Sequence, residues 1–170
     1  MADARDDRDL GALAVFAAAT ATAAGIGGAA TAGAVRSDWY RELEKPSWQP
    51  PQQAFGPVWT ALYAQSTWSA WRVHRAARRD PALRDRSRAA LAAWGVHLGL
   101  NAAWSIAFFG RRSIRGGLAV IVPLWLSVAA TAVLSARVEG RAGVAYAPYL
   151  AWVAVATALN ERIRELNPDS

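Results

Sequence analysis

Long apolar stretches alternate with short arginine-rich segments along this 170-residue chain. Four of the stretches reach the ~20 residues with which a helix crosses about 30 Å of hydrocarbon, and a fifth is shorter but lies between evident loops. The sequence therefore predicts an all-α integral membrane bundle of five transmembrane helices, in a single domain, with a structured loop between the first two helices. The domain covers residues 1–170, and its predicted spans run approximately over 10–35, 55–72, 89–109, 116–136 and 144–163.

The overall charge is high for a membrane protein, with a formal net charge of +6 and a pI near 10.7, and the mean hydropathy is only +0.08. These averages hide a segregation, because the arginines lie between the apolar stretches. Arginines in that position are typical of topology signals and of contacts with lipid headgroups. No basic face remains for a soluble nucleic-acid-binding domain, so we expect the lipid bilayer, and not nucleic acid, as a partner.

The basic residues also predict an orientation. The first nine residues are acidic and polar, and the apolar stretch after them is too long for a signal-peptide core, so we expect it to remain as the first span. With five spans, the N-terminus, the segment 72–88 and the turn around Arg141 share one side and hold eleven of the nineteen basic residues. The positive-inside rule then favours a cytoplasmic N-terminus. The Ala- and Arg-rich composition suggests a bacterial plasma membrane.

Residues suited to catalysis are scarce. No aspartate or glutamate lies in the interior of a predicted span, which weighs against proton-coupled transport. The chain has no cysteine, and its histidines, His74 and His97, are far apart in sequence, so we expect no metal site. No Ser-His-Asp arrangement, glycine-rich phosphate loop or carboxylate pair is present. The sequence therefore predicts no obligatory cofactor and leaves open whether the protein is an enzyme.

Polar and aromatic residues come together in the predicted span 89–109. His97 and Asn101 are four residues apart and share a helix face, with Trp94 and Trp104 on either side. An imidazole or amide at membrane depth normally faces the bundle interior or a cavity. Two interpretations stay open: an interhelical hydrogen bond that fixes packing, or a cavity wall that contacts a ligand. A role for His97 as a haem axial ligand is the least favoured.

The same span carries small residues at four-residue spacing, Gly95, Gly99 and Ala103. Such a stripe allows two helices to approach closely. It lies on a different face from His97 and Asn101, so one helix could line a pocket and also form a helix contact. We expect this stripe either to pack within the bundle or to form the interface of a homodimer.

The segment 36–54 is rich in tryptophan and proline. Its prolines restrict the backbone, and the rings of Trp39 and Trp48 supply a large apolar area, so we expect this loop to pack against the protein. It could lie at the membrane interface against lipid headgroups. Alternatively, it could form a lid over a cavity between the spans.

Several motifs in this chain resemble those of one family of membrane proteins. They are Trp39-Tyr40, Lys45-Pro46-Ser47-Trp48, Pro57-Val58-Trp59, Leu100-Asn101-Ala102-Ala103-Trp104 and Pro148-Tyr149-Leu150-Ala151-Trp152. In this order and spacing they resemble the TspO/MBR family of tryptophan-rich sensory and translocator proteins. The resemblance implies a five-helix bundle, usually a homodimer, with a pocket beneath the first loop that takes porphyrins such as protoporphyrin IX or haem-related tetrapyrroles.

The functions implied by the resemblance are porphyrin sensing, sequestration, transport or light-dependent degradation, linked to stress responses. The alternative is a transporter of lipid, sterol-like or porphyrin molecules. The resemblance makes Trp59 and Trp152 candidate photochemical residues, since they match the pocket tryptophans associated with porphyrin breakdown. The candidate ligand-binding residues are these two together with Trp39, Trp48, Pro50, Tyr63, His97, Asn101, Trp104, Ala156 and Leu159.

Overall fold

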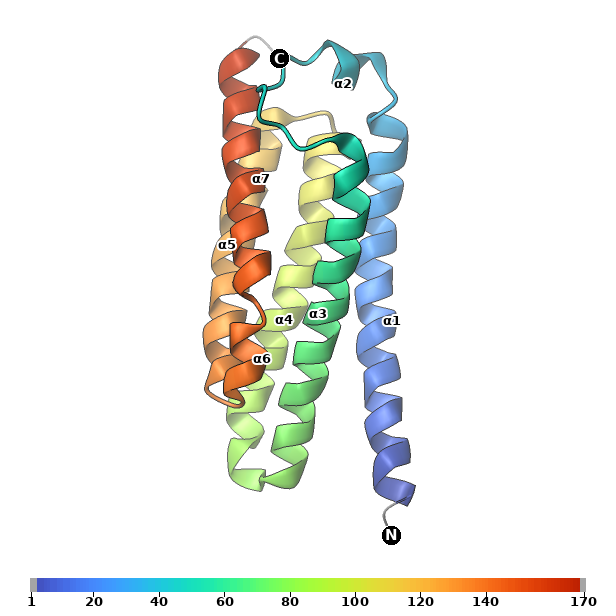
Figure 1. Cartoon of the computed structure of the whole chain (residues 1–170), viewed down its shortest axis with the longest axis vertical. Coiled ribbons are helices and arrows are strands. Elements are labelled where there is room, and N and C mark those ends of the chain that lie inside the picture. The colour runs from blue at the N-terminus through green and yellow to red at the C-terminus, as the bar shows by residue number, and fades with distance from the viewer. Residues whose placement is uncertain (1–2, 169–170) are drawn as a thin grey trace.

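The computed structural model describes the backbone of residues 3–168 and the side chains of residues 9–168. Over the described residues the chain is helical and contains no strand. Long helices run side by side along one axis (Figure 1). They are α1 (Asp3–Ala34), α3 (Gln52–Arg79), α4 (Arg84–Ser105), α5 (Ile114–Ala136) and α7 (Ala147–Leu166). The short elements are α2 (Asp38–Glu42), η1 (Pro81–Leu83), the π-helical turn η2 (Ile106–Gly110) and α6 (Gly140–Val144).

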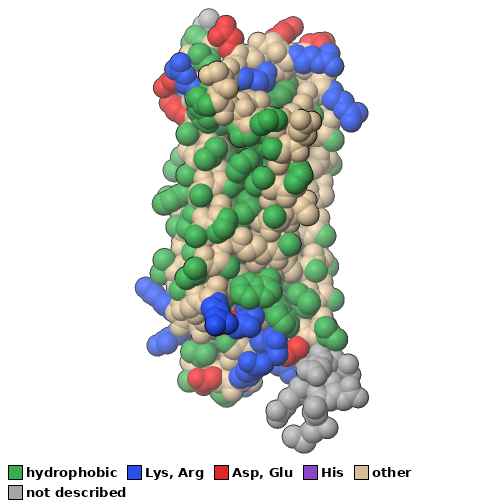
Figure 2. All heavy atoms as spheres, viewed as in Figure 1, with side chains coloured by type: hydrophobic (Ala, Val, Ile, Leu, Met, Phe, Trp, Pro, Cys, Tyr) green, Lys and Arg blue, Asp and Glu red, His purple; other side chains and the backbone are tan. Residues whose placement is uncertain are grey.

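Four helical segments of the described chain are long and apolar enough to cross a membrane. They are Asp9–Ala34, Pro81–Gly110, Ile114–Ala136 and Gly140–Leu166. Figure 2 shows hydrophobic side chains over the middle of the bundle, with Lys, Arg, Asp and Glu gathered at its two ends. An apolar band between two charged ends, as seen on this face, is the surface that a bilayer requires. The chain is therefore an integral membrane protein.

The segment between the second and third predicted spans is mostly helical. The prediction ended the span at Arg72, whereas α3 continues to Arg79 and α4 already begins at Arg84. Arginine is a good helix former, so a run of arginines ends the apolar stretch without ending the helix. The helix stops at Asp80, whose side-chain oxygen accepts a hydrogen bond from the Ala82 backbone N–H at 2.9 Å.

The last predicted span also differs from the structure at its start. The prediction was one helix from residue 144, whereas the structure has α6, a break at 145–146, and then α7. Pro148 lies in the first turn of α7, where a missing N–H costs no helical hydrogen bond. Gly143 of α6 faces α5 so closely that a Cβ there would lie 2.4 Å from the Ala136 Cβ. The short helix α6 is thus seated directly on the backbone of α5.

Candidate functional site

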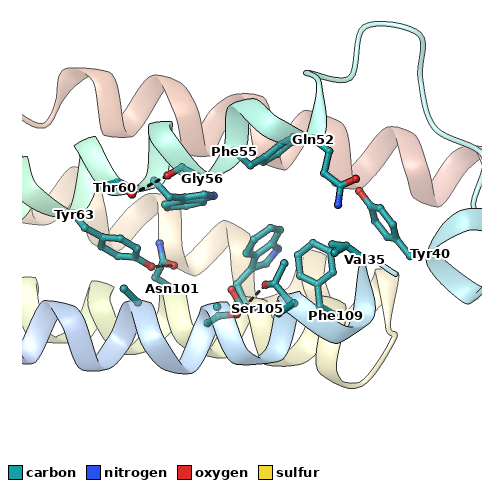
Figure 3. Close-up of a pocket in the computed structure, with 17 residues that line it drawn as sticks. Val35, Tyr40, Gln52, Phe55, Gly56, Thr60, Tyr63, Asn101, Ser105 and Phe109 are labelled. Carbon is teal, nitrogen blue, oxygen red and sulfur yellow. Dashed lines mark hydrogen bonds between the residues drawn. The ribbon is translucent and has the colours of Figure 1, made fainter. Parts of the chain in front are cut away.

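A cavity of about 420 Å³ lies between α1, α3 and α4, towards the end of these helices where α2 is found (Figure 3). Figure 3 shows Tyr63 and Asn101 at one end of the cavity, and Tyr40 and Gln52 at the other. None of the described residues that line it carries a charge. The lining residues are Ala24, Gly27, Gly28, Thr31, Ala32, Val35, Tyr40, Gln52, Phe55, Gly56, Trp59, Thr60, Tyr63, Asn101, Trp104, Ser105 and Phe109.

The α1 wall of the cavity consists of small side chains. A Cβ on Gly27 would lie 3.1 Å from the Ser105 Oγ, so this glycine lets α1 approach α4 closely. Gly28 borders the cavity and has open space where a Cβ would point. The hydroxyl of Thr31 donates to the Gly27 carbonyl at 2.8 Å, so its polar group is already satisfied within the helix. The cavity therefore exists because α1 presents almost no side-chain volume.

The opposite walls are aromatic. Phe55, Trp59 and Tyr63 follow at four-residue intervals and share one face of α3. The Trp59 and Tyr63 ring centroids are 5.7 Å apart, with their planes tilted by 31°. Trp104 of α4 and Phe109 of η2 complete the aromatic lining, with ring centroids 5.7 Å apart. The arrangement suits a flat apolar ligand that stacks against rings on one side and against small residues on the other.

Asn101 fixes the polar end of the cavity. Its side-chain oxygen accepts a hydrogen bond from the Tyr63 hydroxyl at 2.7 Å, and its side-chain N–H donates to the Tyr149 hydroxyl at 2.8 Å. Asn101 thus joins α3, α4 and α7 while also bordering the cavity. Asn101 therefore both makes interhelical hydrogen bonds and forms part of the cavity wall, so the two interpretations left open for it do not exclude each other.

His97, four residues earlier, lies outside the cavity. It is fully buried, with Nε2 3.3 Å from the Ser66 Oγ and Nδ1 3.3 Å from the Thr131 Oγ1. Trp94 donates its indole N–H to the same Ser66 oxygen at 3.0 Å. Both ring nitrogens of His97 therefore have partners on neighbouring helices, an arrangement that fits the packing interpretation and leaves no nitrogen free for a haem iron. Over residues 9–168, no group of His, Cys, Asp and Glu side chains could hold a metal ion.

Three candidates on α7 lie behind the cavity wall. The ring centroid of Trp152 is 6.5 Å from that of Trp59 and 5.5 Å from that of Phe55, so it supports both rings from behind. Ala156 and Leu159 are buried in the core against other helices. The wall expected from the last span is instead supplied by α1. The first predicted span, residues 10–35, consists largely of Ala, Gly and Thr, a composition that favours close helix approach and does not by itself indicate a binding site.

Comparison with known proteins identifies a family for this chain. The sequence profile of the TspO/MBR family matches residues 14–166. The protein CrtK of Rhodobacter capsulatus is 40% identical over 156 residues, which cover 92% of each chain. The tryptophan-rich sensory protein of Cereibacter sphaeroides is 38% identical over 146 residues, 85% of this chain and 87% of the relative. The human translocator protein is 34% identical over 122 residues, 72% of this chain and 70% of the relative.

The chain belongs to the TspO/MBR family. The family membership predicted from its tryptophan and proline motifs is thereby confirmed.

In this TspO/MBR protein, the segment before α3 lies against the end of the bundle. Trp39 packs edge-on against Phe108 at a ring-centroid distance of 5.9 Å, whereas Trp48 is 50% exposed. Neither of them borders the cavity, and nor does Pro50; Tyr40 and Gln52 take that position. Lys45 orders the segment from within, because its ammonium donates to the backbone oxygens of Tyr40 and of Leu43, the latter at 2.8 Å.

Asn167 fastens this segment to the end of α7. Its side-chain oxygen accepts from the Glu44 N–H at 3.0 Å, and its side-chain N–H donates to the Glu44 carbonyl at 2.9 Å. We expect Asn167→Ala to cost about 1–2 kcal/mol of local stability, because both bonds are lost. Trypsin cleavage after Arg41, followed by mass spectrometry, should accelerate severalfold. Glu165→Ala, which removes an exposed ion pair with Arg162, should leave the rate unchanged. Equal rates in both variants would show that Asn167 does not hold the segment.

The small-residue stripe lies on the outer side of α4. Gly95 and Gly99 are exposed, and a Cβ on either would meet nothing within 4 Å. Ala103, one turn further on, is half-buried. The two glycines are thus not used for packing within this chain, and a homodimer contact through the stripe stays a prediction.

Proposed function

We propose that this protein binds a tetrapyrrole, such as protoporphyrin IX or a haem-related porphyrin, in the cavity between α1, α3 and α4. The observation that carries the proposal is the lining of the cavity. Aromatic rings line it from α3 and from α4 with η2, and mostly small side chains line it from α1. A flat conjugated macrocycle stacks well on indole and phenol faces. The tetrapyrrole would be a ligand, not an obligatory cofactor. The names of two relatives, tryptophan-rich sensory protein and translocator protein, favour sensing or transport as the purpose of binding.

We also propose a five-span topology, in which α3 crosses the membrane in addition to the four apolar segments. This helix has 28 residues, so it is about 42 Å long. Polar residues lower its mean hydropathy, but several of them face the protein interior and not lipid. Ser66, Thr67 and Ser69 are all buried and hydrogen-bonded. An odd number of spans puts the start of α1 and the end of α7 on opposite sides, as they lie in Figure 1. The positive-inside rule then favours a cytoplasmic N-terminus in a bacterial plasma membrane. We also propose that Gly95, Gly99 and Ala103 form a homodimer contact.

Light-dependent porphyrin breakdown is a second candidate function, favoured by two neighbouring tryptophans whose rings meet edge to face. Trp59 borders the cavity, and Trp152 lies behind Trp59, with 6.5 Å between the two ring centroids. An indole in contact with an excited porphyrin can donate one electron to it, which leaves an indole radical cation and a porphyrin radical anion for reaction with oxygen. Trp59 would be the direct donor, and electron transfer from Trp152 would then restore Trp59 and leave the radical cation on Trp152.

Filling the cavity from α1 tests the proposed site. Gly28 lines the cavity, and a Cβ there points into open space, so a leucine would take up cavity volume. Gly25 is on the same helix and does not line the cavity, and a Cβ there would also meet nothing within 4 Å. We expect Gly28→Leu to weaken protoporphyrin IX binding at least about tenfold, a cost of ~1.4 kcal/mol, and Gly25→Leu to leave it unchanged. The measurement is a titration followed by porphyrin absorbance and tryptophan quenching. Unaltered binding by a folded Gly28→Leu protein would exclude this cavity, and absence of binding by the wild-type protein would refute the tetrapyrrole proposal.

A further inference from the structure

A second hollow, of about 500 Å³, adjoins the main cavity at the α2 end of the bundle. Val35, Tyr40 and Gln52 border both spaces, so the hollow lies where a ligand in the main cavity would emerge from the apolar interior. This end of the bundle is also one of the two where charged side chains gather (Figure 2). The hollow therefore lies at the depth of the polar membrane interface.

The lining of the hollow is basic, in contrast to that of the main cavity. Arg36, Arg41 and Lys45 contribute to it, and no acidic side chain does so among the residues described. Their positive charges are not equally available to a ligand. The Lys45 ammonium is already bonded to two backbone oxygens of its own segment. The two arginines remain.

Both arginines can reorient towards a ligand. The Arg36 side chain is exposed and has no ion-pair or hydrogen-bond partner among residues 9–168. Arg41 contacts Asp38 at 3.5 Å, but both side chains are largely exposed, so this pair is weak and easily exchanged. Two guanidinium groups beside an uncharged aromatic cavity form a surface with one chemical requirement: an anionic group attached to an apolar body. Guanidinium forks suit the planar oxygens of a carboxylate particularly well.

We infer that Arg36 and Arg41 bind the anionic group of an amphiphile whose apolar body occupies the main cavity. The inference rests on the proposed function for the apolar half of the ligand and adds its chemical class, an acid. At the interface the anion keeps partial access to water, so it avoids the cost of full desolvation. Two sources could supply this chemistry: the carboxylates of an acidic porphyrin, or the phosphate of an anionic lipid headgroup.

The first arm of the test compares an acid with its ester. Protoporphyrin IX and its dimethyl ester are titrated in neutral detergent against the wild-type protein, against Arg36→Gln/Arg41→Gln, and against Arg111→Gln/Arg115→Gln. The control pair removes the same charge at the same end of the bundle and borders neither cavity. We expect the first double variant to bind the diacid about tenfold more weakly and the ester unchanged, because only the acid can use charged hydrogen bonds. The control variant should bind both ligands as the wild type does.

The second arm tests the lipid source and does not depend on porphyrin. Tryptophan quenching is measured with lysophosphatidylglycerol and with lysophosphatidylcholine of the same brominated acyl chain. A preference for the anionic lipid that disappears only in Arg36→Gln/Arg41→Gln assigns the site to a headgroup phosphate. If the wild-type protein binds neither porphyrin, the tetrapyrrole proposal fails while this arm still tests the anion site. The inference is overturned if the variant loses neither the diacid nor the anionic-lipid preference.

Discussion

Replacing Trp59 with leucine is expected to weaken protoporphyrin IX binding about 30-fold, since stacking on one indole contributes ~2 kcal/mol. Trp59 lines the cavity and lies between Tyr63 and Trp152, so its ring is the largest flat surface that α3 offers to a ligand. Leucine keeps apolar bulk at the position but removes the π-face. The dissociation constant is measured by absorbance titration in detergent, with circular dichroism to verify folding.

Two further tryptophans serve as comparisons for Trp59. Trp152→Leu should weaken binding by only a few-fold, because Trp152 supports the Trp59 ring from behind and does not border the cavity. Trp68→Leu should have no effect, since Trp68 is on the same helix but 38% exposed and away from the cavity. A loss with Trp152→Leu as large as that with Trp59→Leu would mean that the ligand lies between α3 and α7. That result would contradict the cavity assignment.

The positions of the long helices were largely predictable from the sequence. The spans predicted over 89–109 and 116–136 correspond closely to α4 with η2 and to α5, because an uninterrupted apolar run has one low-energy conformation in a bilayer. The errors arose where helix ends and membrane ends differ. Arginines after residue 72 remain helical, and the turn at 145–146 lies inside an apolar stretch with no local breaker other than Pro148.

The candidate site was predictable only in part. Trp59, Tyr63, Asn101 and Trp104 were singled out from the sequence and do meet around one cavity. The α1 wall was missed because glycine and alanine leave no chemical signature; their contribution is the volume that they do not fill. The placement of Trp152 behind Trp59 depends on the rotation of α7 against α3, a tertiary property that motif spacing does not encode.

Substituting Gly143 by alanine is expected to destabilise the protein by about 3 kcal/mol, the upper end of the usual cost of overpacking. A Cβ there would lie 2.4 Å from the Ala136 Cβ and 2.6 Å from the Ala132 carbonyl oxygen. Because one of these is a backbone atom of α5, no side-chain rotation relieves the clash and α6 must move away. That movement would also break the 2.7 Å hydrogen bond from the Ser69 hydroxyl to the Ala142 carbonyl, which ties α6 to α3.

The measurement for Gly143→Ala is thermal unfolding in one detergent, where a loss of this size corresponds to a fall of about 10 °C in the melting temperature. Gly140→Ala is the matched control, since it adds the same methyl group to the same short helix in open space. Alanine is also the better helix former, so the control should melt at or slightly above the wild-type temperature. If the two variants melt together, α6 is not seated on α5 as described. If only Gly143→Ala falls, the break before α7 is held in place by this backbone contact, which also positions Tyr149 to receive the hydrogen bond from Asn101.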